Sequence, residues 1–268
     1  MDSLANITEV IPLFYLGVLA SFFAGAATGI GGLPILVTQS ISRRAQDTML
    51  GFGAGVMLAA TSFSLIIPGI DAVTSTTGNT IYAAVVMVAG IMLGGVFLYL
   101  GDRFLPHEHF IKGREGLDTA KLRRVWLFIL AITLHNFPEG MAVGVGFGTG
   151  DIQNGLVLAI GIGLQNIPEG LVVAMALLAH NYTRGYSLWI ALLSGLVEPV
   201  GGAIGAGIIQ ISQPLLPWGL AFAAGAMLYV ISNEIIPESH RKGYEREATF
   251  GVLIGFVVMM FLDVTLGG

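Results

Sequence analysis

The sequence contains no cysteine among its 268 residues. Disulfide bridges and thiolate metal ligands are therefore excluded, although this absence fixes no cellular compartment. Charge is also scarce, because Asp, Glu, Lys and Arg make up 11% of the chain against 54% hydrophobic residues, and the mean hydropathy is +0.81. Soluble domains carry about 25% charged residues. The composition therefore predicts an integral membrane protein without a soluble domain.

Eight apolar stretches reach or approach the roughly 20 residues that an α-helix needs to cross a bilayer. They cover residues 10–37, 48–70, 81–101, 125–149, 152–179, 187–211, 215–237 and 248–268. We therefore predict an all-α fold in which eight transmembrane helices form a single domain over residues 1–268. No basic residue precedes the first stretch, which favours a retained helix over a cleaved signal peptide.

Basic residues are absent from the middle of these stretches and occur only in alternate connections. They follow the first, third and fifth spans and precede the eighth: Arg43, Arg44, Arg103, Lys112, Arg114, Lys121, Arg123, Arg124, Arg184, Arg241, Lys242 and Arg246. Lys and Arg concentrate in cytoplasmic loops. We therefore predict a multi-pass protein of the cell (inner or plasma) membrane, with both termini outside and a cytoplasmic loop at about residues 102–124.

Parts of the sequence repeat at an offset of 170 residues. The run AGVML at 54–58 pairs with AGAML at 224–228, and an IIP run follows each, at 66–68 and 235–237. The first three spans thus resemble the last three, and the two copies would cross the membrane in opposite directions. We predict an inverted repeat of helices 1–3 and 6–8 around central helices 4 and 5, an arrangement typical of secondary transporters.

Polar residues recur near the middle of the fourth, fifth and sixth spans. The fourth span contains HNFPEG at 135–140, the fifth contains QNIPEG at 165–170, and the sixth contains Glu198. A carboxylate at this depth costs several kcal/mol unless it is protonated or paired. Since every Lys and Arg lies in a loop, two explanations stay open for Glu139, Glu169 and Glu198: the side chains are neutral, or a bound cation supplies the counter-charge.

The neighbouring residues favour a cation. His135 precedes Glu139 by four residues, and Gln165 precedes Glu169 by four, so each pair shares one helix face. The prolines of both motifs lack an N–H and free a backbone carbonyl one turn earlier, and Pro199 is expected to free the carbonyl of Gly195 in the same way. Imidazole nitrogen together with carboxylate and amide oxygen suits Zn²⁺, Fe²⁺, Mn²⁺ or Cd²⁺.

These motifs on consecutive helices, with a glutamate in the next one, resemble the ZIP (Zrt/Irt-like) metal transporters, particularly their bacterial branch, over essentially the whole chain. The resemblance implies a secondary transporter, not an enzyme, that carries Zn²⁺ and related divalent ions (Fe²⁺, Mn²⁺, Cd²⁺) into the cytoplasm. One or two ions would bind between helices 4, 5 and 6.

The resemblance also implies a ligand set. One ion would be held by His135, Glu139, Gln165 and Glu169, and a second by Asn136, Asn166 and Glu198 with the first two glutamates shared. Some bacterial members have Asp at the position of Asn166. Loss of that negative charge should weaken the second site.

Further polar residues could line the path of the ion. Near the outer ends of spans 2 and 8, Asp71 and Asp263 are candidates for an entrance. Candidates for an exit lie near the cytoplasmic end of span 7 and in the long loop: Asn233, Glu234, Glu238, His240, His107 and His109.

Two other function classes stay open on the residues alone. An intramembrane metal-dependent hydrolase could use a helix-borne His and Glu to activate water, but the HExxH signature of such proteases is absent. A metal-selective channel or sensor would share the same site. The expected partners are divalent metal ions and the lipid bilayer, with a homodimer as an open alternative and no nucleic acid.

The charge alternation predicts the accessibility of single cysteines, which the cysteine-free chain makes simple to introduce. In intact cells, cysteines at Ser3 and Gly150 should react with an impermeant thiol reagent, whereas one at Glu115 should react only after permeabilisation. Protection of both Ser3 and Gly150 would reverse the predicted orientation.

Overall fold

The structure is a computed structural model that describes residues 12–38, 41–104, 119–241 and 243–266, and all regular structure in these residues is helical. The elements follow the order α2 (Leu13–Gly32), η1 (Leu33–Leu36), α3 (Arg43–Ala60), η2 (Thr61–Ile66), α4 (Ile67–Thr77), α5 (Thr80–Phe104), α6 (Thr119–Gly148), α7 (Ile152–Leu178), α8 (Arg184–Gly195), α9 (Glu198–Ile211), η3 (Gln213–Leu215), α10 (Leu216–Val230), η4 (Ile231–Ile235), α11 (Ile236–Ser239) and α12 (Glu245–Leu266). The all-α prediction is confirmed for this part of the chain.

Seven stretches of the described chain are long and apolar enough to cross a membrane: Leu13–Leu36, Arg43–Thr77, Thr80–Leu100, Ile152–Leu178, Arg184–Ile211, Leu216–Ser239 and Glu245–Leu266. The 30-residue helix α6 covers the remaining predicted span at 125–149. Each apolar stretch found in the sequence therefore corresponds to helix.

Several helices extend beyond the apolar stretches and end at capping residues. Before α3, the Ser42 side chain accepts a hydrogen bond from the N–H of Ala45, and Asp151 and Thr183 cap α7 and α8 in the same way. At the other end of the second span, Gly78 has a φ of 66° and terminates α4. Side-chain oxygens satisfy the first free N–H groups of a helix, and glycine adopts the left-handed conformation without strain. The second span is consequently longer than its apolar run.

Two spans contain a segment of π-helix at matching places. The six residues of η2 precede the Ile-Pro pair that starts α4, and the five residues of η4 precede the Ile-Pro pair that starts α11. Because Pro68 has no N–H, the carbonyl of Ser64 lacks its usual helical partner, and the Asn154 side chain of α7 donates to it (3.4 Å). The two IIP runs thus share one local form, while the inverted repeat stays a prediction.

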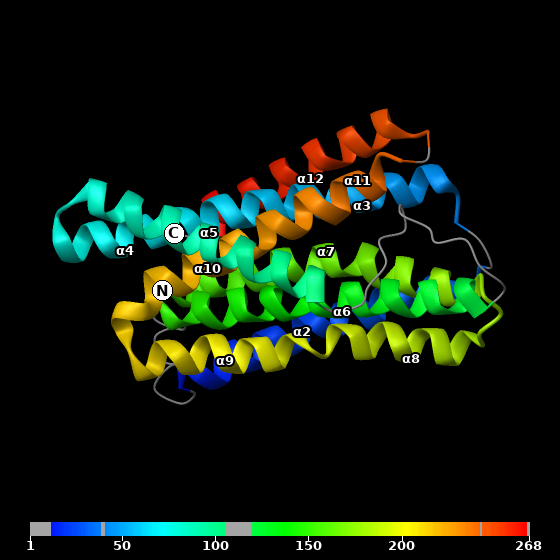
Figure 1. Cartoon of the computed structure of the whole chain (residues 1–268), viewed down its shortest axis with the longest axis horizontal. Coiled ribbons are helices and arrows are strands. Elements are labelled where there is room, and N and C mark those ends of the chain that lie inside the picture. Colours follow the sequence, from blue (N-terminus) through cyan, green and yellow to red (C-terminus); the bar gives the residue numbers. More distant parts are fainter. Residues whose placement is uncertain (1–11, 39–40, 105–118, 242, 267–268) are drawn as a thin grey trace.

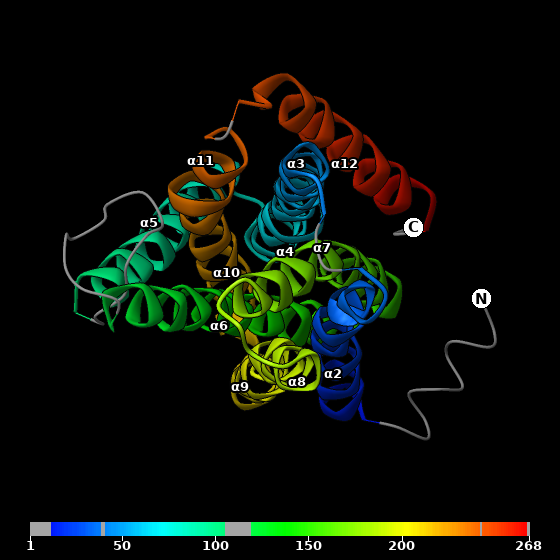
Figure 2. The ribbon, with the colours of Figure 1, turned by 90° about the vertical axis from the view of Figure 1, so that its right-hand side faces the viewer.

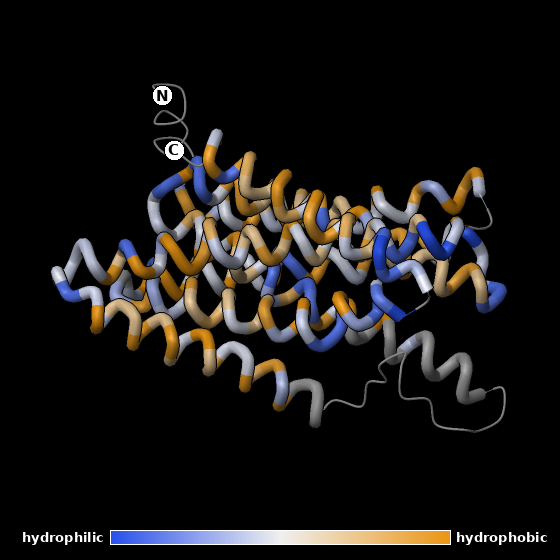
Figure 3. The backbone as a smooth tube through the Cα atoms, turned by 90° about the horizontal axis from the view of Figure 1, so that it is seen from above, coloured by the Kyte–Doolittle hydropathy of each residue, from blue (hydrophilic) through white to orange (hydrophobic). Residues whose placement is uncertain are grey.

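The helices form an elongated bundle in which α2 begins and α12 ends at the same end (Figure 1). Viewed along the bundle, α7 lies in the interior, and α5 and α12 lie at separate edges (Figure 2). The spans of α5 and α12 are 28% and 17% buried, against 61% for α7. Hydrophilic positions gather at the bundle ends and recur at mid-length within hydrophobic helices (Figure 3). The centre of the bundle is therefore where a polar site has to be sought.

Glycines bring several helix pairs into direct backbone contact. A Cβ at any of these glycines would overlap a carbonyl oxygen of the facing helix: Gly31 and Ile167, Gly170 and Thr28, Gly140 and Glu198, Gly55 and Val252, Gly94 and Phe222, and Gly225 and Ile91. Small residues allow such close approach in membranes, where helices associate through packing and interhelical hydrogen bonds. The pairs joined in this way are α2 with α7, α6 with α9, α3 with α12, and α5 with α10.

Two adjacent glycines of α5 test this packing. A Cβ at Gly94 would overlap the carbonyl oxygen of Phe222, whereas one at Gly95 would lie 3.7 Å from the carbonyl oxygen of Gly225, an ordinary contact. Gly94→Ala should therefore lower the thermal unfolding midpoint in detergent, since overpacking costs about 1–3 kcal/mol. Gly95→Ala is the control and should leave the midpoint unchanged or higher. Equal midpoints for both variants would contradict the close contact.

Candidate metal centre

The two motifs lie on α6 and α7, each of which has a proline inside the helix, Pro138 and Pro168. Each proline removes one main-chain hydrogen bond from its helix. The residues proposed from the sequence as metal ligands are all buried, at most 5% exposed: His135, Asn136, Glu139, Gln165, Asn166, Glu169 and Glu198. The helices therefore direct these polar side chains into the protein and away from lipid.

Glu198 reaches the interior at a break between two helices. α8 ends at Gly195 and α9 begins at Glu198, and the N–H of Gly201 donates to the carbonyl of Val197 (3.2 Å). The span that the sequence predicts at 187–211 is therefore one membrane-spanning stretch that consists of two helices. Proline fits the first turn of a helix, where its missing N–H costs nothing, so a new helix starts there. The carboxylate of Glu198 consequently lies at the positive end of the α9 dipole.

Amide side chains connect this carboxylate to α7 and α2. Asn166 donates through Nδ2 to the carbonyl oxygen of Ala24 (2.9 Å) and to Oε1 of Glu198. Gln165 donates through Nε2 to Oδ1 of Asn166 (2.8 Å). Three helices are thus joined by buried hydrogen bonds, and these bonds fix the orientation of both amides. Their remaining oxygen, Oε1 of Gln165, accepts no hydrogen bond.

The carboxylates themselves are poorly satisfied. Both oxygens of Glu139, both oxygens of Glu169 and Oε2 of Glu198 are buried and accept no hydrogen bond from the part of the chain that the structure describes. Glu139 is near enough to Glu169 and Glu198 for their charges to interact, and Glu169 interacts similarly with His135. A buried polar atom without a partner costs about 1–3 kcal/mol, more when charged. A divalent cation among these oxygens would remove that cost and the mutual repulsion.

His135 contacts a residue that the sequence placed elsewhere. Its Nε2 lies 2.8 Å from Oε1 of Glu234, a residue of η4. The sequence suggested Glu234 as part of an exit, but the structure places it against the centre. Since π-helix changes the face on which later residues emerge, the ordinary helical period could not locate this side chain.

The ligands are not already gathered around one point. Among the described residues, no three His, Asp or Glu side chains lie close enough together to hold a metal ion. His135 is directed to Glu234 instead. The described positions of these side chains are therefore not those of an assembled metal site.

The entrance candidates lie in different environments. Asp71 is exposed on α4. Asp263, on α12, is half-buried and accepts a hydrogen bond from Oγ of Ser64 (2.7 Å). Their role at an entrance stays a prediction.

The exit candidates are engaged with neighbours where the structure describes them. Glu238 pairs with Arg241 (3.1 Å), and Nε2 of His240 lies 3.0 Å from Oγ1 of Thr249. Asn233 is exposed on η4. His107 and His109 lie outside the described residues.

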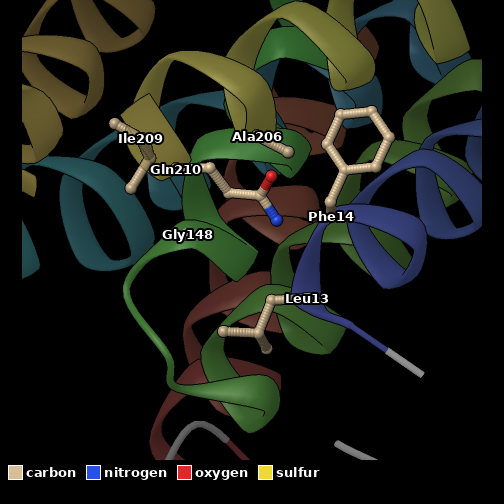
Figure 4. A pocket seen from close by; sticks show the side chains of 6 residues that line it. All are labelled: Leu13, Phe14, Gly148, Ala206, Ile209 and Gln210. Carbon is tan, nitrogen blue, oxygen red and sulfur yellow. The ribbon is translucent and has the colours of Figure 1, made fainter. Parts of the chain in front are cut away.

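A small cavity at the end of the bundle is separate from this centre. It has a volume of about 140 Å³ and is lined by Leu13, Phe14, Gly148, Ala206, Ile209 and Gln210 (Figure 4). Its lining is apolar apart from Gln210 and contains none of the proposed metal ligands. It therefore offers no charged group for a cation.

Comparison with known proteins gives consistent matches. Residues 107–263 match the family model described as ZIP zinc transporter. The chain is 52% identical to the zinc transporter GufA of Myxococcus xanthus, over 94% of this chain and 99% of that protein. It is 50% identical to the zinc transporter ZIPB of Bordetella bronchiseptica, over 90% of this chain and 78% of that protein. Identity to the human zinc transporter ZIP11 is 35%, over 93% and 96% of the two chains.

Asn136 offers a test of the centre's construction. Its Nδ2 donates to the carbonyl of Ser194 (2.8 Å), close to the break after α8, while its Oδ1 has no partner. Asn136→Asp keeps a ligand oxygen but removes this donor. The free energy of unfolding should therefore decrease by about 1–3 kcal/mol, and the thermal unfolding midpoint should fall.

The matched control is Asn79→Asp. Asn79 is exposed, and its side-chain Oδ1 accepts from the N–H groups of Ile81 and Tyr82 (both 3.1 Å). An aspartate oxygen can accept these bonds equally well. Similar midpoints for Asn136→Asp and the parent protein would show that the bond to Ser194 contributes little.

Proposed function

The chain belongs to the ZIP zinc transporter family, and on this premise we propose that it carries Zn²⁺ across the membrane into the cytoplasm through the centre between α6, α7 and α9. Members of this family are transporters and not enzymes, so the hydrolase alternative is set aside. The protein is a multi-pass membrane protein whose transported substrate is zinc or a related divalent metal. The direction of transport and the use of Fe²⁺, Mn²⁺ or Cd²⁺ are part of the proposal.

The unsatisfied carboxylates carry this proposal. Glu139, Glu169 and Glu198 are at most 5% exposed and leave buried oxygens without a hydrogen bond. All Lys and Arg residues belong to the connections or helix ends. Among the described residues, the basic side chain near these carboxylates is His135, which already contacts Glu234. A transported dication supplies the balance and leaves again, which a structural salt bridge could not do.

We propose two ion positions that share Glu139 and Glu169. His135 and Gln165 would complete one, and Asn136, Asn166 and Glu198 the other. The contact of Asn166 with Glu198 and the free oxygens of Gln165 and Asn136 support this division. Since Asn166 is neutral, the second position would hold its ion more weakly than the first.

The contact between His135 and Glu234 supports a route beyond the centre. An ion held by His135 would have Glu234 as a neighbouring ligand on η4, and the same span continues to Glu238 on α11. The basic residues at that end place it in the cytoplasm under the predicted topology. A carrier with alternating access is favoured by the predicted inverted repeat, whereas a channel would share the residues but not the saturation kinetics.

Uptake of Zn²⁺ into sealed proteoliposomes tests the proposal. Glu169→Ala should abolish uptake, because the remaining ligands cannot offset the charge of the ion in a low-dielectric site. Asn166→Ala should reduce uptake only in part, and Asn166→Asp should strengthen the second position, measured as bound metal per protein.

Glu245→Ala is the matched control, since Glu245 is exposed at the start of α12, and it should transport as the parent does. Counter-flow of labelled Zn²⁺ distinguishes a carrier from a channel. Normal uptake by Glu169→Ala would refute the proposed route.

A further inference from the structure

A groove runs between α2 and α8 on the surface of the bundle. It has a volume of about 450 Å³ and is lined by Ala26, Gly29, Ile30, Leu33, Gly185, Leu188, Trp189 and Leu192. On both helices the lining residues recur at intervals of three and four, which places them along one face. None of the proposed metal ligands lines it, so the groove is a feature distinct from the transport site.

The groove is open, and its lining is predominantly apolar. Ile30, Leu33 and Trp189 are 57%, 48% and 55% exposed. At Gly185 an added Cβ would meet nothing within 4 Å. Each stripe spans seven residue steps and therefore about 10 Å of helix. These dimensions suit a hydrocarbon chain lying along the two helices.

The positively charged side chain of Arg184 lies at one end of this groove. Arg184 is the first residue of α8 and directly precedes Gly185. Its Nη1 donates to the carbonyl oxygen of Leu36 (2.7 Å). This acceptor is neutral, and a guanidinium has five N–H donors. As far as the described residues go, the charge and the other donors therefore remain for a ligand. The N-terminal end of α8 adds a favourable dipole at the same place.

The combination of an apolar groove and a cation at its end identifies an amphipathic ligand. We propose that the groove binds an anionic glycerophospholipid, with its phosphate at Arg184 and an acyl chain between α2 and α8. Anionic lipids are enriched where juxtamembrane basic residues lie, and Arg184 is one of those that predict the cytoplasmic side. This binding does not depend on the proposed transport function.

Fluorescence of Trp189 tests the proposal directly. The chain has three tryptophans, so Trp126→Phe with Trp218→Phe leaves Trp189 as the reporter. In lipid bilayers, brominated phosphatidylglycerol should quench the fluorescence of Trp189 at about fivefold lower mole fraction than brominated phosphatidylcholine. This factor corresponds to the attraction between one arginine and an anionic lipid. Zinc uptake is not part of this measurement.

Substitutions distinguish binding of the lipid phosphate from binding of the acyl chain. Arg184→Gln should abolish the preference for phosphatidylglycerol while quenching by phosphatidylcholine persists. Arg43→Gln is the control, a basic residue at the start of α3 whose guanidinium contacts Gln46 (3.5 Å), and it should keep the preference. Gly185→Leu fills open space, so it should reduce quenching by both lipids.

Three outcomes would overturn the proposal. Equal quenching by the two lipids in the parent would show that the groove does not select a negative charge, a comparison that needs no change at Arg184. A preference that survives Arg184→Gln would place the phosphate elsewhere. If neither lipid quenches Trp189, a second copy of the chain or another protein covers the groove.

Discussion

The burial of carboxylates in membrane-spanning segments that contain no lysine or arginine near them is the constraint on which this structure depends. Glu139, Glu169 and Glu198 come from α6, α7 and α9 and are almost fully enclosed. Moving a carboxylate from water into a low-dielectric interior is among the largest penalties in protein folding. The fold must therefore provide either hydrogen bonds or a mobile counter-charge. Asn166 provides a bond to one oxygen of Glu198. The other five carboxylate oxygens accept no hydrogen bond from the described residues, and in the proposed function a cation would bind there.

Interruptions of regular helix also contribute to the interior of the bundle. In an intact α-helix the backbone N–H and C=O groups are bonded within the helix, so fewer carbonyl oxygens are left for a neighbour. The carbonyl of Ser194, next to the break after Gly195, accepts a hydrogen bond from Asn136. The carbonyl of Ser64, whose helical donor is missing because Pro68 has no N–H, accepts one from Asn154. Irregular backbone thus provides acceptors for amide side chains on α6 and α7. These amides hold neighbouring helices in register without adding charge.

Much of the fold and the main polar cluster could be predicted from the sequence, because both follow from helix periodicity and bilayer thickness. Four-residue spacing correctly indicated that His135 and Glu139 would both turn inward, and apolar length located each helix. The contact between His135 and Glu234 could not be predicted, since it depends on π-helix in η4. Nor could the break before Glu198, because Pro199 is compatible both with a kink and with a helix start. Hydrogen-bond patterns of this kind are set by tertiary packing and leave no period in the sequence.

The glycine contacts have a consequence for how this sequence can change. At Gly31, Gly140 and Gly94 the atom that excludes a side chain is a main-chain carbonyl oxygen of the facing helix. Every amino acid carries that oxygen, so no substitution on the facing helix can make room for a larger residue. Second-site suppressors of mutations at these glycines should therefore not arise at Ile167, Glu198 or Phe222. Covariation analysis would miss these helix contacts, although they are among the closest in the protein.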